Sequence, residues 1–115
     1  MSQFILALHE QPGQLADASP ETIQAVIARY VAWREDLGAK GLIAGGNKLC
    51  DEGGRWLAAN GEGVLVSDGP YSEAKELMTG YFLINAEDYD GAVALAKTCP
   101  HLENGRIEVR EIEEL

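Results

Sequence analysis

SDGPYSEAKELMTGYFLINA, residues 67–86, joins a tight turn to a run of aromatic and branched residues. The turn is expected at Asp68-Gly69-Pro70, because an Asp side chain accepts hydrogen bonds from nearby backbone N–H groups and proline fixes its own φ angle. The run GYFLINA, residues 80–86, is rich in residues that favour strands. The stretch therefore predicts a strand that follows a turn, and the rest of the chain must supply its neighbours in a sheet.

A long helix is predicted upstream of this stretch. Ser19-Pro20 is a favourable start, with an N-cap residue followed by proline at the first helical position, and Gly38 and Gly41 are expected to end the helix. Apolar residues recur at steps of three and four along one stripe: Ile23, Val26, Tyr30, Trp33 and Leu37. This spacing is typical of a helix that packs one face on a core.

The remaining segments predict more strands and a second helix. The second helix is EDYDGAVALAKTCP, residues 87–100, with acids in its first turn and Pro100 at its end. Strands are expected in QFILALH (3–9), GLIAGGNKLC (41–50), RWLAAN (55–60), VLVSDG (64–69) and GRIEVREIEEL (105–115). Residues 55–69 form a hairpin in this interpretation, and Gly45-Gly46 suggests a bulge or a close backbone approach.

This order of elements predicts an α+β fold over a single domain, residues 1–115. It is the order of a ferredoxin-like β-α-β-β-α-β sandwich, an antiparallel sheet with both helices on one face. The other face of such a sheet is uncovered, and an uncovered apolar face most often binds a second copy of the same chain. A homodimer is therefore expected.

The charge of the chain limits its partners. Nine Lys and Arg against 19 Asp and Glu give 9 − 19 = −10, which repels phosphate backbones and anionic lipid, so neither nucleic acid nor membrane is expected as a partner. The start MSQFILALHEQPG lacks the basic region of a signal peptide. Cys50 and Cys99 form no C-x-x-C pair, which is consistent with two reduced thiols in a cytoplasmic protein.

The stretch VSDGPYSEAKELMTGYFLINA, residues 66–86, resembles the signature of the DGPF proteins, a branch of the YCII-related superfamily. The likeness also covers residues 30–33 of the first helix, Gly45-Gly46 and the closing Ile107–Arg110 strand. The signature phenylalanine is replaced by Tyr71, which adds a hydroxyl. The resemblance implies a ferredoxin-like fold that dimerises through its sheets into an α+β barrel. It also suggests a role with alternative sigma factors of bacterial transcription, with which relatives are often associated.

The chain departs from that family at a position that matters for chemistry. YCII-type proteins carry a His on the first helix and an Asp-Pro after the second, which are proposed as a catalytic pair. Tyr30 and Cys99-Pro100 stand at those places here. The pair cannot be carried over, so any catalysis must use other groups.

Asp68 is the first candidate for a functional side chain. It either makes a structural turn or acts as a general base at a strand end, and both interpretations stay open. Under either interpretation of Asp68, Gly69 and Pro70 set the backbone conformation of the turn. Together with Tyr71 they would border a ligand pocket. Lys75 is either a solvated surface charge or a group that neutralises an anionic ligand.

His9, near the end of the first strand, is the second catalytic candidate, and a hydrogen-bonded structural role is its alternative. Tyr30 and Trp33 lie on the apolar stripe of the helix, so they either pack in the core or turn their polar ends to a pocket. Arg110 either binds a ligand or points to solvent. His101 is a candidate partner for the Cys99 thiol, although no third member of a catalytic set is visible.

No spacing of His and carboxylates fits a metal site, and we expect no metal and no cofactor. Three functions remain open from the sequence. The first is a small-molecule enzyme that uses Asp68 and His9 for proton transfer. The second is a domain that binds or senses a ligand without turnover, and the third is a partner of a sigma factor.

Overall fold

The computed structural model describes residues 1–51, 53–69 and 76–115. In chain order the elements are β1 (Ser2–Glu10), α1 (Pro20–Ala39), β2 (Ile43–Lys48), β3 (Arg55–Ala59), β4 (Val64–Asp68), β5 (Leu77–Ala86), α2 (Tyr89–Ala96), the short 3₁₀ helix η1 (Pro100–Glu103) and β6 (Gly105–Ile112). Each segment that was expected to be a strand or helix contains one, with ends that differ by a few residues.

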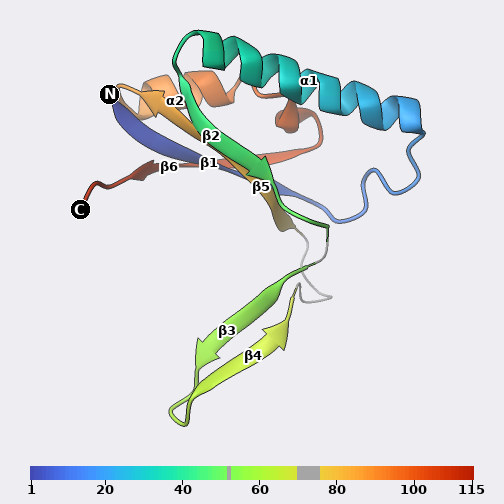
Figure 1. Cartoon of the computed structure of the whole chain (residues 1–115), viewed down its shortest axis with the longest axis vertical. Helices are drawn as coiled ribbons and strands as arrows, with labels where there is room; N and C mark the ends of the chain where they lie inside the picture. Colours follow the sequence, from blue (N-terminus) through green and yellow to red (C-terminus); the bar gives the residue numbers. More distant parts are fainter. Residues whose placement is uncertain (52, 70–75) are drawn as a thin grey trace.

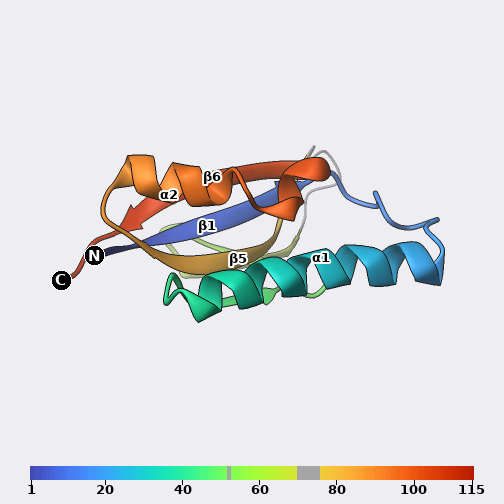
Figure 2. The same ribbon diagram turned by 90° about the horizontal axis from the view of Figure 1, so that it is seen from above.

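Four strands form one sheet in the order β2-β5-β1-β6, and every neighbouring pair is antiparallel. Figures 1 and 2 show α1 and α2 on the same side of this sheet. The α+β, ferredoxin-like prediction is therefore confirmed.

The core lies between the sheet and the helices. Phe4, Leu6 and Ile84 are completely buried there, at 0% exposure, and Trp33 and Leu37 of α1 pack in the same cluster. Because side chains alternate along a strand, the residues between them point to the helix-free face. The cross-strand pairs Ile5–Leu83 and Ala7–Tyr81 lie on that face.

Helix α1 begins where the sequence indicated. The Ser19 side-chain oxygen accepts a hydrogen bond from the Thr22 backbone N–H at 3.1 Å, which satisfies a donor that the first turn leaves free. The helix ends at Ala39, between Gly38 and Gly41, the two glycines that were expected to end it. The turn itself falls at Gly41, whose φ of +71° suits glycine.

Strand β2 contains the irregularity that its glycines indicated. Its register against β5 shifts between Ile43 and Gly45. A Cβ on Gly46 would lie 2.5 Å from Phe82 Cδ1 and 2.8 Å from the Tyr81 carbonyl oxygen. Glycine thus allows β2 to approach β5 closely at this point.

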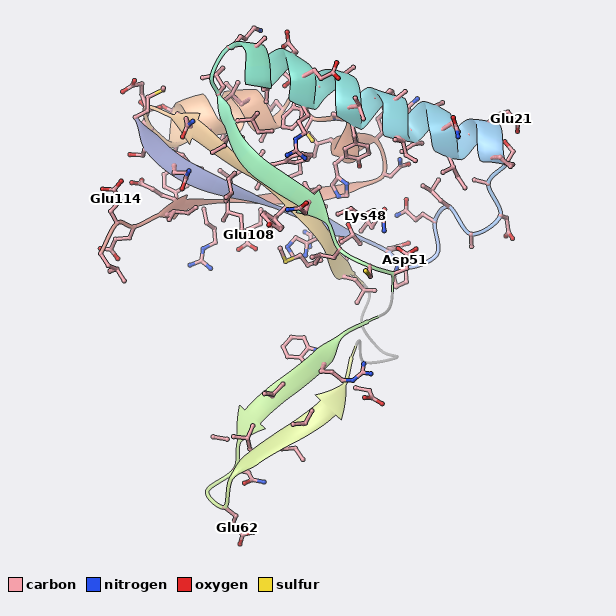
Figure 3. The ribbon with its side chains drawn as sticks, viewed as in Figure 1. Glu21, Lys48, Asp51, Glu62, Glu108 and Glu114 are labelled. Atoms are coloured by element: carbon pink, nitrogen blue, oxygen red, sulfur yellow. The ribbon has the colours of Figure 1, made fainter. Side chains whose placement is uncertain are left out.

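Strands β3 and β4 form a separate two-stranded hairpin, as predicted. Figure 3 shows it leaving the sheet near Lys48 and Asp51, with Glu62 at its far tip. The hairpin projects on the side of the sheet that carries no helix (Figure 1). All ten of its strand residues but Ser67 are exposed.

The position of the core on one face of the sheet can be tested by the stability of two variants of β1. Leu6→Ala should lower the free energy of unfolding by about 2–5 kcal/mol, because a fully buried leucine leaves a cavity. Ile5→Ala, on the helix-free face one residue away, should cost clearly less because Ile5 is only half-buried. Urea unfolding of both variants at low protein concentration measures the difference, and equal losses would contradict the assignment of faces.

Candidate functional site

A cavity of about 470 Å³ lies between the first half of α1 and the adjacent end of the sheet. Its wall is mostly apolar, with a few polar groups from five elements, as is usual for small-molecule sites. The residues that line it are Leu8, Glu10, Leu15, Ile23, Val26, Ile27, Tyr30, Val31, Arg34, Asn47, Lys48, Thr79, Gly80, Phe82, His101 and Asn104.

A chain of hydrogen bonds runs from the cavity wall into the protein. Tyr30 Oη lies 2.8 Å from His101 Nδ1, and His101 Nε2 lies 2.9 Å from the His9 carbonyl oxygen. A carbonyl oxygen only accepts, so Nε2 carries the proton and donates it there. In the neutral imidazole Nδ1 is then an acceptor, and Tyr30 donates its hydroxyl hydrogen to it. The lone pairs of Tyr30 Oη remain available to the cavity.

The environment keeps this tyrosine protonated. Burial is the main cause that raises the pKa of the Tyr30 hydroxyl well above its usual range, and nearby Cys99, Glu10 and Glu103 raise the same pKa further. Tyr30 is therefore a neutral hydrogen-bonding group at physiological pH. His101 beside it is only 1% exposed, so its ring has little freedom to rotate away.

Gly105 makes room for the imidazole. A Cβ at this position would lie 2.5 Å from His101 Nε2 and also against the His9 carbonyl oxygen. Such contacts are too short for any real side chain, so a larger residue would push these two partners apart. The glycine at the start of β6 is thus required by the His101–His9 hydrogen bond.

Charged side chains stand at the edge of the cavity. Arg34 Nη1 donates to the Gly46 carbonyl oxygen at 2.9 Å, and Lys48 Nζ lies 2.8 Å from Asp51 Oδ1. Glu10 adds an acidic group to the same wall. The cavity thus combines an apolar interior with both signs of charge at its border, which suits a polar organic molecule rather than a pure hydrocarbon.

The structure places Asp68 outside this cavity. It is the last residue of β4, its side chain is 90% exposed, and its Oδ1 lies 3.3 Å from Arg55 Nε. Gly69 packs against the Trp56 ring, which a Cβ would meet at 2.6 Å. Pro70, Tyr71 and Lys75 lie outside the described residues. The catalytic role of Asp68 stays a prediction.

The other predicted residues lie on different faces. Tyr30 lines the cavity, but Trp33 is a core residue whose Nε1 donates to Thr98 Oγ1 at 2.8 Å. Trp33 also contacts Phe82 edge to face, with ring centroids 5.0 Å apart. Arg110 pairs with Ile5 across the sheet, on the helix-free face.

His9 contributes to both sides of the sheet. Its carbonyl oxygen holds His101, whereas its side chain points to the helix-free face, where Nε2 lies 3.5 Å from Glu108 Oε1. Next to it, Arg106 forms a bidentate ion pair with Glu76, and the hydrogen bonds from Arg106 lower the Glu76 pKa. The structure does not bring the His9 ring into the cavity with Tyr30.

Sequence reasoning missed the partner of His101. The Cys99 thiol was one candidate partner, but the His101 ring nitrogens hydrogen-bond to Tyr30 and to His9, residues 71 and 92 positions away. Cys99 is buried, and burial raises the pKa of its thiol, which makes it a poor nucleophile. Only the tertiary fold joins these residues, since no local spacing in the chain links them.

Within residues 1–51, 53–69 and 76–115, no three His, Cys, Asp or Glu side chains gather in a way that could hold a metal ion. In the same part of the chain, no helix is both long and apolar enough to span a membrane.

A one-sided antiparallel sheet with two helices on one face and a cavity under the first helix defines a ferredoxin-like α+β domain. The chain belongs to the YCII-related domain family, which matches residues 2–115. No curated protein matches the chain. Its fold is similar to that of 5-chloro-2-hydroxyhydroquinone dehydrochlorinase from Burkholderia phenoliruptrix AC1100, solved in complex with 2,5-dihydroxybenzoquinone. That similarity has a TM-score of 0.56 at 18% identity and covers 96% of this chain and 93% of the other.

Gly105→Ala tests the hydrogen-bond chain. The added methyl group should displace the His101 ring, lower the melting temperature and change the chemical shifts of its ring nitrogens. Gly45→Ala is the matched control, because Gly45 also lies in a strand without a positive φ and an added Cβ there would meet Leu83 Cδ1 at an ordinary 3.8 Å. Unchanged ring-nitrogen shifts in Gly105→Ala, measured by NMR, would contradict the packing described above.

The raised Tyr30 pKa predicts a stability loss in alkali. Above about pH 10 the unfolded chain releases the tyrosine proton, but the native state retains it, so stability falls as pH rises. Tyr30→Phe should remove this contribution and give a shallower decline between about pH 10 and pH 12. Denaturant midpoints across that range compare the two proteins, and equal slopes would contradict the raised pKa of Tyr30.

Proposed function

We propose that this protein is an acid–base enzyme that acts on a small hydroxylated aromatic molecule bound in the cavity under α1. The observation that carries the proposal is the 2.8 Å contact of Tyr30 Oη with His101 Nδ1 at the cavity wall. The apolar lining suits a flat ring, and the free lone pairs of Tyr30 suit a ligand hydroxyl.

The residues form a path for one proton. A ligand O–H donates to Tyr30 Oη, Tyr30 donates to His101 Nδ1, and His101 Nε2–H donates to the His9 carbonyl oxygen. When the ligand O–H bond breaks, its proton passes to Tyr30 as the Tyr30 proton passes to Nδ1. The products are a ligand oxyanion and an imidazolium, so the charge balances. The reverse transfer returns the proton to the ligand.

The fixed geometry is what makes this transfer efficient. Tyr30 is a poor base by itself, because burial favours its protonated form. The adjacent imidazole removes that obstacle, since Tyr30 gains one proton as it loses another. The His9 carbonyl holds the imidazole in the tautomer that accepts, much as an acidic residue does in other acid–base sets. Arg34 and Lys48 at the border would favour the ligand anion.

The similar dehydrochlorinase gives this substrate class some support, since it was solved with a dihydroxylated quinone. We also propose that the protein assembles as a homodimer through the helix-free face of the sheet, where Ile5 and Leu83 pair. Its cytoplasmic location and the sigma-factor role implied by the resemblance stay predictions.

4-Nitrophenol tests the proton path because its absorbance distinguishes phenol from phenolate. Wild-type protein should bind it and lower its apparent pKa. Tyr30→Phe should weaken binding by about tenfold, the loss of one hydrogen bond in a buried site, and should abolish the pKa change. Tyr89→Phe removes a hydroxyl that lies outside the cavity wall, where it accepts a hydrogen bond from the Glu111 backbone N–H at 2.8 Å, and should alter neither.

The outcomes separate the competing functions. Binding without any change in the ionisation of the probe would indicate a domain that holds ligands without catalysis. Equal effects of Tyr30→Phe and Tyr89→Phe would place the ligand elsewhere and overturn the proposed site. A dependence on Asp68→Asn instead would favour the hypothesis centred on the Asp-Gly-Pro turn.

A further inference from the structure

Among the described residues, two cationic side chains line the cavity, and the protein neutralises one of them. Lys48 Nζ lies 2.8 Å from Asp51 Oδ1 and donates to the Leu49 carbonyl oxygen at 3.0 Å. Arg34 differs, because in the part of the chain that the structure describes it makes no ion pair with a carboxylate. A guanidinium without a counter-charge at the border of an apolar cavity favours a ligand that carries an anionic group.

The main chain of β2 holds the Arg34 guanidinium in place. Its Nη1 donates to the Gly46 carbonyl oxygen at 2.9 Å, at the point where the missing side chain of Gly46 brings β2 close to β5. The donors Nε and Nη2 of Arg34 have no hydrogen-bond partner in the described part of the chain. They form one edge of the planar group, which matches the two oxygens of a carboxylate. Arg106 binds Glu76 through the same two nitrogens.

Arg34 and Tyr30 reach the cavity from the same helix. They are four positions apart and both line the cavity wall, so they lie on one face of α1, about 6 Å apart along its axis. Two substituents at opposite positions of one aromatic ring are separated by a similar length. A hydroxyl at Tyr30 and a carboxylate at Arg34 can therefore belong to the same small molecule.

An acidic side chain decides which way round such a molecule binds. Glu10 lines the cavity from the end of β1. A Cβ on Gly105 would meet both the Glu10 Cβ, at 3.1 Å, and the His101 ring, so Glu10 stands on the Tyr30–His101 side. Strand β5 separates β1 from β2, which places the Glu10 and Arg34 walls about 10 Å apart, or two strand spacings. A carboxylate is repelled from the first wall and attracted to the second.

We propose that the ligand is a hydroxylated aromatic carboxylate, bound with its ring hydroxyl at Tyr30 and its carboxylate on the Nε–Nη2 edge of Arg34. The ligand occupies the same cavity and uses the same tyrosine as in the proposed function, on which this inference rests. A ring held at both ends presents one hydroxyl to Tyr30 in a fixed orientation. The net charge of −10 opposes an approaching anion, but at physiological ionic strength that repulsion is screened beyond about 8 Å.

4-Hydroxy-3-nitrobenzoate tests the role of Arg34, because its carboxylate lies opposite the hydroxyl and its nitro group makes binding visible by absorbance. Its methyl ester is the matched probe without the charge. Wild-type protein should bind the acid at least about tenfold more tightly than the ester. Arg34→Gln should bring the two affinities within about twofold of each other by weakening the acid alone. Unchanged binding of the ester shows that the cavity of the variant is intact.

Lys40→Gln is the control for charge alone. It also removes one positive charge from the α1 region, but Lys40 pairs with Asp36 at 3.1 Å and lies outside the cavity wall. This variant should keep the wild-type preference for the acid. An equal loss of preference in Lys40→Gln and Arg34→Gln would indicate a general charge effect and would overturn the contact with Arg34.

The ester distinguishes a failure of this inference from a failure of the proposed function. If wild-type protein binds acid and ester equally, or if the preference survives in Arg34→Gln, the carboxylate contact is wrong. The proposed function still holds in that case, provided that Tyr30→Phe weakens binding of the ester. If neither probe binds, or if Tyr30→Phe leaves binding of the ester unchanged, the proposed function is wrong and the carboxylate contact falls with it.

Discussion

The hydrogen bond from His101 Nε2 to the His9 carbonyl oxygen holds three parts of the fold in one arrangement. It ties η1 to the end of β1, and through Nδ1 it reaches Tyr30 on α1. Because a carbonyl can only accept, this one contact also decides which nitrogen faces the tyrosine. The His101 nitrogen that faces Tyr30 is therefore selected by a main-chain oxygen. A substitution of the His9 side chain would leave this oxygen in place.

That contact depends in turn on how closely β6 approaches β1. Gly105 pairs with Glu10 across the two strands. Because Gly105 has no side chain, the His101 ring has room to lie beside it and to reach the His9 carbonyl oxygen. Gly46 likewise lets β2 approach β5 closely, because it has no side chain. Glycines at these two positions set the spacing of the elements around the cavity, which neither burial nor helix packing would fix alone.

The fold could be predicted from the sequence because its signals are local. Three local signals each indicate an element without reference to the rest of the chain: the Ser19 cap, the stripe that includes Trp33 and Leu37, and the aromatic and branched residues of β5. The candidate site could not be predicted in the same way. Tyr30 and His101 are 71 positions apart, and each has an ordinary local explanation, as a core tyrosine and a residue after a helix. Asp68 lies in an Asp-Gly-Pro motif that is easy to recognise in a sequence. Such a motif forms a turn whether its Asp has a structural role or a catalytic one.

The arrangement also bears on the family resemblance. The resemblance expects an imidazole from the first helix and a carboxylate after the second, where this chain has Tyr30 and Cys99-Pro100. His101, immediately after Pro100, supplies the imidazole instead, and the helix supplies a phenol. An imidazole beside a carboxylate is readily charged, since the carboxylate stabilises the added proton. The imidazole of His101 has a phenol and a main-chain carbonyl as its hydrogen-bond partners instead of a carboxylate. Under the proposed function, the positive charge that this imidazole gains with the transferred proton is compensated by the ligand anion that forms in the same step.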